Sequence, residues 1–153
     1  MMKKGFSDMD MILKYASCAF ATVLTWFTWM VGGWDAVLGV MFVAMGLDYI
    51  TGVSCAALGC SPKTTDGTFR SSVAFIGLTK KLLMLVIVAL AVLVDRLLGT
   101  QGICRLAAIG FYSANEGLSI IENCSRMGVP FPQSLLEMLK KLRSRYNDDS
   151  LDE

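Results

Sequence analysis

The chain has 153 residues, of which 54% are hydrophobic and 18% are charged, and its net charge is +1. Soluble domains are about 45–50% apolar and about 25% charged, so this composition favours a single domain that meets lipid. The near-zero net charge gives no basic field, and RNA-binding and zinc-finger signatures are absent from the sequence, so we expect no nucleic acid partner.

The first segment, residues 1–14, carries three lysines ahead of a long apolar block. The letters YASC at 15–18 resemble a lipoprotein cleavage site, but no apolar core of about 7–15 residues precedes Cys18. We therefore expect residues 1–14 to be a cytoplasmic N-terminus and the apolar block to stay in the protein.

Two apolar blocks follow, at 15–34 and 36–58. The first contains no charge and is long enough to cross a hydrocarbon core, which takes about 20 helical residues. Tryptophans gather toward its far end, where such rings prefer the membrane–water boundary: Trp26, Trp29 and Trp34. Gly32, Gly33 and Asp35 supply a turn, and Asp48 interrupts the second block. The two blocks predict a transmembrane hairpin.

A loop-like stretch at 59–72 separates these blocks from two further apolar segments. The run LLMLVIVALAVLV at 82–94 spans only about 20 Å as a helix, so a crossing must extend beyond it at one end. Lys80 and Lys81 would snorkel there. Residues 99–102 end this segment, and a fourth runs from 103 to about 124.

Basic residues predict the orientation of these segments. They lie before the first block, between the second and third, and after the fourth, whereas the first turn has none. The positive-inside rule then gives four crossings with both termini in the cytoplasm. The alternative is three crossings, with one of the last two segments lying at the interface.

The fourth segment carries a polar stripe within NEGLSIIEN at 115–123 and upstream of it. Seven polar or amphipathic residues share an arc of about 120° on a helical wheel: Arg105, Tyr112, Asn115, Glu116, Ser119, Glu122 and Asn123. Charges at the bilayer centre cost several kcal/mol, so the stripe must turn away from lipid. Three arrangements satisfy this: a buried seam, a water-lined or oligomer-interface surface formed by several copies, and a surface-lying helix before assembly. Assembly is favoured because four helices leave little room to hide two glutamates.

Asp48 is a candidate for an intramembrane ion pair with Lys80 or Lys81. Small residues share its helical face, which lets another helix approach closely: Gly52, Cys55 and Gly59. The ion pair either fixes helix packing or senses protons or ions. The spacing of the residues does not distinguish between these two roles.

The last segment, 125–153, predicts a cytoplasmic amphipathic helix and an acidic tail. Two prolines, Pro130 and Pro132, break the chain, and Ser134 to Glu137 match a capping box. Leucines then fall on one face and basic residues on the other: Lys140, Lys141, Arg143 and Arg145. Such a helix suits an anionic membrane surface, or it is simply solubilising.

The five cysteines lie in or beside apolar blocks without a CxxC pair, and the chain has no histidine. Zinc sites and histidine-based catalysis are therefore not expected, and no nucleophile–base pair is readable. We expect reduced thiols that act as small packing residues, no metal, no cofactor and no enzymatic activity.

Three stretches together carry a family resemblance: DYITG at 48–52, KKLLMLVIVALAVLVD at 80–95, and FYSANEGLSIIENCSRMGVPFPQSLLEMLKKLR at 111–143. Over about residues 40–143 the chain resembles the toxin-secretion and phage-lysis holins. The Asn-Glu-x-x-Ser-x-x-Glu-Asn block is the most specific part. The resemblance implies an all-α integral membrane protein with a transmembrane holin domain at 15–124.

It also implies a homo-oligomer in the host cytoplasmic membrane that forms timed lesions, through which an endolysin reaches the wall or a toxin leaves. An antiholin is a possible partner. Two other functions stay open: an antiholin regulator, and a small cation channel or transporter that uses Asp48, Glu116 and Glu122.

Overall fold

The computed structural model describes the backbone of residues 2–61, 71–135, 137, 138 and 141, with side chains omitted for 2–8 and 10. This part of the chain is all-helical, with four long helices: α1 (Met2–Met30), α2 (Ala36–Ala57), α3 (Ser71–Leu98) and α4 (Ile103–Arg126). The all-α prediction is confirmed. The apolar run at 82–94 extends at both ends, because α3 begins eleven residues before it and ends four after it.

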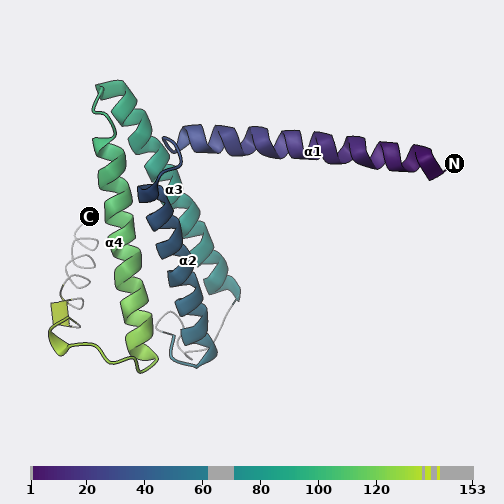
Figure 1. Ribbon diagram of the computed structural model, residues 1–153. Coiled ribbons are helices and arrows are strands. Elements are labelled where there is room, and N and C mark those ends of the chain that lie inside the picture. Colours follow the sequence, from purple (N-terminus) through teal and green to yellow (C-terminus); the bar gives the residue numbers. More distant parts are fainter. Residues whose placement is uncertain (1, 62–70, 136, 139–140, 142–153) are drawn as a thin grey trace.

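Helices α2, α3 and α4 form a bundle in which α4 packs along both of the others, whereas α1 projects crosswise away from it (Figure 1). Within the described residues, α1 meets the bundle at its C-terminal end, where Phe27 packs on the core and Arg96 lies over the Trp29 ring. The two apolar blocks are joined by a short turn, as the sequence predicts, but they do not run side by side. The turn between them is held against α4, and the crossing of a membrane by both blocks as a hairpin stays a prediction.

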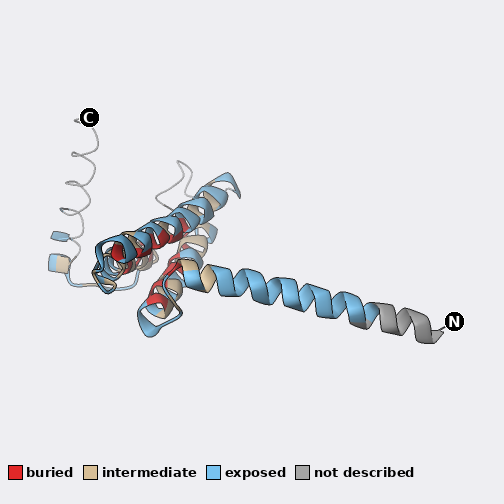
Figure 2. Ribbon diagram, turned by 90° about the horizontal axis from the view of Figure 1, so that it is seen from above, coloured by how far each residue is buried: buried red, intermediate tan, exposed pale blue. Residues whose placement is uncertain are grey.

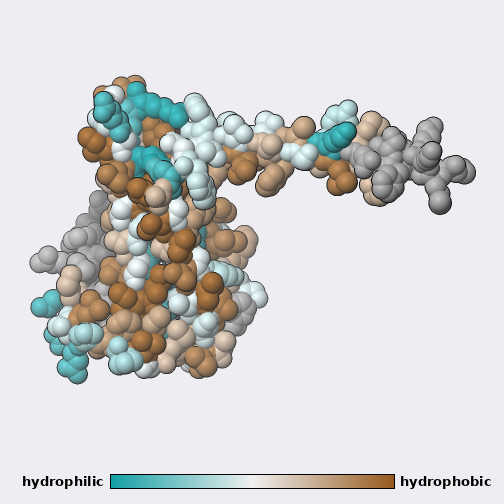
Figure 3. Space-filling view, in the orientation of Figure 1, coloured by the Kyte–Doolittle hydropathy of each residue, from teal (hydrophilic) through white to brown (hydrophobic). Residues whose placement is uncertain are grey.

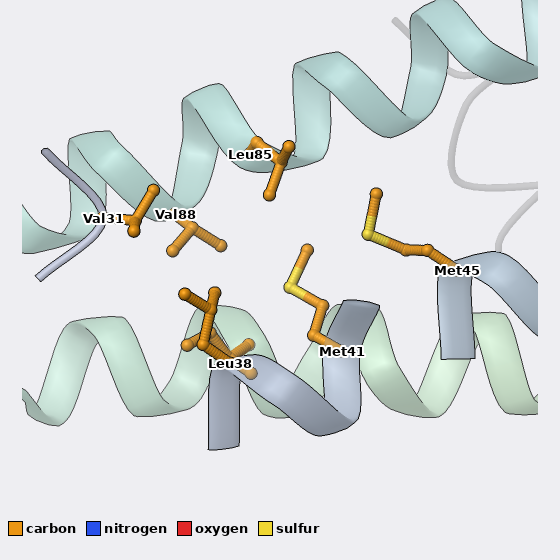
Figure 4. Close-up of a cluster of buried hydrophobic side chains, with 7 residues drawn as sticks. Val31, Leu38, Met41, Met45, Leu85 and Val88 are labelled. Carbon is orange, nitrogen blue, oxygen red and sulfur yellow. The ribbon is translucent and has the colours of Figure 1, made fainter. Parts of the chain in front are cut away.

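The core of the bundle is a small cluster of apolar side chains from the turn and all three packed helices (Figure 4). Its buried members are Val31, Leu38, Met41, Met45, Leu85, Val88 and Ile109. Spacings of three or four residues along α2 and α3 place their members on one face, as in helices packed lengthwise, and α4 contributes Ile109. The core is therefore a lengthwise seam.

Each of the four helices ends at a glycine with a left-handed backbone. The φ angles are 83°, 71°, 70° and 89° at Gly32, Gly59, Gly99 and Gly128. The amide after each glycine donates to a carbonyl five residues back, the Schellman pattern: Gly33 to Thr28, Cys60 to Cys55, Thr100 to Asp95, and Val129 to Cys124. Because only glycine adopts this conformation cheaply, the sequence determines where these helices end.

We expect Gly32→Ala to destabilise the protein more than Gly33→Ala, by about 1–3 kcal/mol, because of overpacking. Both positions have positive φ, so both substitutions share the backbone strain. A Cβ on Gly32 would lie 2.9 Å from Arg105 Cδ and 3.0 Å from Val92, whereas a Cβ on Gly33 meets nothing within 4 Å. Unfolding of the two purified variants in mild detergent measures the difference, and equal stabilities would contradict the close packing of this turn.

The outer faces of the helices are apolar and uncovered (Figures 2 and 3). Large side chains point outward along α3, among them Leu82, Val86, Leu90 and Leu93. Soluble monomers rarely expose a contiguous apolar surface of this extent. In the part of the chain that the structure describes, two helices are long and apolar enough to cross a membrane, at Met11–Met30 and Ala36–Ala57.

Some predictions fall on residues outside the described ranges. Two are Lys63 and Arg70, basic residues between the second and third apolar blocks on which the predicted orientation depends. The others belong to the predicted C-terminal helix and tail: Lys140, Arg143, Arg145 and the acidic residues after them. Short helical stretches are present at 133–135 and 137–138. The helix there begins at Gln133, before the expected cap at Ser134, and the Leu135 amide donates to the Pro132 carbonyl at 3.0 Å.

Candidate functional site

A cluster of charged side chains lies inside the bundle, with one member from each packed helix. Lys81 of α3 stands between Asp48 of α2 and Glu116 of α4. Its Nζ atom is 2.8 Å from Asp48 Oδ2 and also donates to Glu116 Oε2. The three residues are only 7%, 6% and 3% exposed, respectively. The bundle therefore closes around two carboxyl groups and one ammonium group.

The spacing along each helix explains why these residues meet. Asp48 follows the core residue Met45 by three positions, and Lys81 precedes Leu85 by four. Glu116 follows Ile109 by seven. Each charged residue therefore continues the apolar seam of its own helix, and the heptad spacing brings all three to the bundle axis.

Asn123 extends the cluster by two turns of α4. Its Nδ2 atom donates to Asp48 Oδ1 at 3.4 Å and to Thr51 Oγ1 at 3.2 Å. The same amide lies 3.6 Å from the position of a Cβ on Gly52. On the small-residue face predicted beside Asp48, α4 thus approaches α2 at Gly52, whereas Cys55 is buried and Gly59 belongs to the turn.

A second polar centre lies at the other end of α4, around Arg105. Its guanidinium group forms a salt bridge of 2.6 Å to Asp35 Oδ2 and donates to the carbonyls of Val31 and Gly33 at 2.7 and 3.1 Å. The Asp35 carboxylate also caps α2 through the Leu38 amide. Arg105, and then the Leu38 bond, hold the pKa of Asp35 below its ordinary value. Arg105 therefore clamps the turn between α1 and α2 onto α4.

Asp95 is the third charged residue at this end of α4, and it was not among the site residues predicted from the sequence. Its carboxylate accepts hydrogen bonds from the backbone amides of Cys104 and Arg105, at 2.9 and 2.8 Å, and from the Thr100 hydroxyl. The Gly102 cap of α4 has no side chain to do this, so Asp95 caps α4 from the preceding helix. The sequence feature that could have identified Asp95 is its position on the buried face of α3, seven residues after Val88.

The structure divides the predicted polar stripe of α4. Glu116 and Asn123 point into the bundle, Tyr112 packs on the core, and Arg105 holds the turn. The remaining three residues form what we call the rim, at the edge of α4: Asn115, Ser119 and Glu122. Asn115 is exposed, Ser119 and Glu122 are half-buried, and Glu122 pairs with Arg126 at 3.2 Å. A pore-lining role for any of the seven stays a prediction.

The other ion-pair candidate, Lys80, is exposed. The helix turns by about 100° per residue, so Lys80 and Lys81 cannot both face the axis. Among the described residues, no group of three or more histidine, cysteine, aspartate or glutamate side chains could hold a metal ion. The geometry of the cluster is that of ion pairing.

Comparisons with known proteins identify the family. Residues 25–144 match the model of the bacteriophage holin family, which includes all of α2, α3 and α4. A 14.9 kDa protein from the nagH 3′ region of Clostridium perfringens is 41% identical over 139 residues, covering 90% of this chain and 99% of that protein. A protein of Bacillus phage phi105 named a probable holin is 34% identical over 107 residues, 70% of this chain and 74% of its own.

An uncharacterized protein of Listeria monocytogenes is 32% identical over 141 residues, or 92% of this chain and 94% of that protein. No solved structure matches the chain. The family match spans most of the sequence and includes both polar centres of the bundle. The chain therefore belongs to the bacteriophage holin family.

Proposed function

We propose that this protein is a multi-pass holin that assembles in the bacterial cytoplasmic membrane and opens lesions that release an endolysin or a large protein. Family membership and the phage relative named a probable holin support this. Two candidate spans and the uncovered apolar faces support a place in the membrane. Holins are non-enzymatic membrane proteins, so their activity depends on how their polar groups are arranged in lipid.

The packing of the bundle favours crossings by α2, α3 and α4 together. Helix α2 has 22 residues and is about 33 Å long, which matches a hydrocarbon core of about 30 Å. Since α4 runs along both α2 and α3, a crossing by α2 carries the other two with it. The charges of α3 and α4 then lie inside the protein, which lowers the free-energy cost of placing these two more polar helices in lipid.

Helix α1 supplies a fourth crossing in this proposal and brings both termini to the cytoplasm. Its segment Met11–Met30 is apolar enough to insert on its own. In the structure α1 lies crosswise to the bundle, so insertion requires it to rotate about the turn at 31–35. The basic residue Lys14 at its start fits the cytoplasmic side.

The observation that carries lesion formation is the uneven burial along α4. The bundle hides Glu116 and Asn123, but it leaves the rim at the protein's surface. Within a bilayer the rim must meet another copy or water, because polar groups facing acyl chains cost several kcal/mol. Small clusters would pair their rims, and a closed ring would turn many rims toward a shared aqueous lumen. A critical concentration then sets the time of opening.

We expect the combined variant Asn115→Leu, Ser119→Leu, Glu122→Leu to accumulate in membranes but to delay or abolish release of a cytoplasmic protein. Leucine side chains at the rim can face acyl chains without a free-energy cost, so the copies no longer gain by assembling around water. The matched control Asn115→Gln, Ser119→Thr, Glu122→Gln keeps polarity at the same positions and should retain release. Wild-type timing in the leucine variant, at equal membrane levels, would contradict the proposal.

Inducing the wild-type chain alone in bacteria separates the three functions. A holin should collapse the membrane potential, kill the host and release a cytoplasmic protein. A cation channel should collapse the potential while protein stays inside, and an antiholin should be harmless alone and delay the lysis caused by a holin. Retention of protein after the potential has collapsed would reject the holin proposal.

A further inference from the structure

We propose that the Asp48–Lys81–Glu116 cluster is a proton-binding site: one proton is shared between the two carboxyl groups while the bundle is closed. The proton is released when the bundle opens to water. The second statement rests on the proposed function, whereas the first concerns the closed protein alone.

The geometry of the carboxyl groups carries the proposal. Both accept a hydrogen bond from the same Lys81 Nζ atom, and both residues are buried, so two carboxyl groups share one site inside the bundle. Two carboxylates that converge on one cation repel each other, so ionising both in a buried site is unfavourable. A proton on one of them removes this repulsion, as in other carboxyl pairs that share a site.

The charge of the cluster leads to the same conclusion. Two carboxylates and one ammonium carry a net charge of −1 inside a bundle whose neighbouring core residues, Met45 and Leu85, are apolar. One additional proton makes the cluster neutral and removes the cost of burying that charge.

The groups that face the cluster come from all three packed helices. Helix α2 contributes Asp48 and α3 contributes Lys81, and α4 contributes Glu116 together with the neutral amide of Asn123. The following charged groups of the described residues lie elsewhere. Lys80 is exposed, the Glu122–Arg126 pair lies at the edge of α4, and Asp35, Asp95 and Arg105 occupy the opposite end.

The direction of the pH effect follows from proton counting. The closed bundle binds one more proton than an open state whose carboxylates and lysine are separated in water. Raising the pH therefore favours the open state, by up to about tenfold in the open-to-closed ratio per pH unit. Lowering the pH should keep the bundle closed. Alkaline conditions should thus lower the protein concentration at which lesions appear.

Infrared spectroscopy of the full chain in phospholipid vesicles tests the proton directly. With 13C-labelled aspartate and glutamate, the wild type at pH 7 should show the isotope-shifted C=O stretch of a protonated carboxylic acid. Glu116→Gln should lose this band, because its amide replaces the protonated acid and leaves the Asp48–Lys81 pair neutral. Glu137→Gln, at an exposed position outside the bundle, should keep the band. Absence of the band in the wild type, or its persistence in Glu116→Gln, would overturn the proposal.

Release of a trapped dye from the same vesicles tests the coupling. Between pH 6 and pH 8, release by the wild type should increase with pH, while release by Glu116→Gln should be independent of pH. A parallel pH dependence in both proteins would overturn the coupling. If no dye is released at any pH, the proposed holin function fails, and the infrared band still decides whether the proton site exists.

Discussion

Replacing Lys81 by methionine is expected to destabilise the bundle by about 3–5 kcal/mol, because it leaves two buried carboxyl groups without their cation. Methionine has nearly the length of the lysine stem, so packing is largely kept while the charge is removed. Lys81 forms salt bridges to both Asp48 and Glu116. The free energy of unfolding in mild detergent and the amount of protein in membranes measure the effect.

The neighbouring substitution Lys80→Met is the matched control, since Lys80 is exposed. It should change stability by less than about 0.5 kcal/mol. Combining Lys81→Met with Asp48→Asn and Glu116→Gln should recover much of the lost stability, because no unpaired charge is then buried. Equal stabilities of Lys81→Met and Lys80→Met would show that the cluster does not hold the bundle closed.

Replacing Arg105 by glutamine is expected to release α1 from its crosswise position and to cost about 2–3 kcal/mol. The guanidinium group joins Asp35 and the carbonyls of Val31 and Gly33 to α4, and a shorter neutral side chain cannot reach all three. The Asp35 salt bridge contributes little to this cost, because the Asp35 side chain is 46% exposed and water screens the pair.

Spin labels measure the position of α1. One label sits on the exposed Cys18 and the other on Leu98→Cys at the end of α3, with the remaining cysteines replaced by alanine. The distance distribution should broaden in Arg105→Gln and stay narrow in Arg126→Gln, which removes an arginine from the far end of α4. Arg105→Lys should be intermediate, because lysine keeps the charge but loses the forked geometry. Unchanged distances in Arg105→Gln would show that other contacts hold the turn.

The ends of the helices could be predicted from the sequence because they depend on local chemistry. Gly32 and Gly99 stop helices by adopting left-handed backbone, and Asp35 caps α2 through its own side chain. The amphipathic character of α4 is likewise a property of residue spacing. Asp95 could not be recognised in this way, because it caps a helix that begins eight residues later in the chain.

The spacing of residues along the sequence does not show which of Lys80 and Lys81 is buried. Both lysines precede the same apolar run, and the rotation of α3 against α2 and α4 determines which one is buried. The division of the polar stripe has the same origin, since α4 can bury only the part of the stripe that faces both partners. The heptad spacing shared by Asp48, Lys81 and Glu116 with the core was a readable signal for this seam.

The sequence by itself determined that the protein is helical, where its helices end, that it suits lipid and to which family it belongs, because these follow from composition, spacing and motif. Tertiary structure alone decided that Lys81 joins Asp48 to Glu116, that Arg105 holds the turn, and that α1 lies apart from the bundle. The physical reason is that a buried charge is stable only beside its partner. Partners on different helices meet only once the helices have packed.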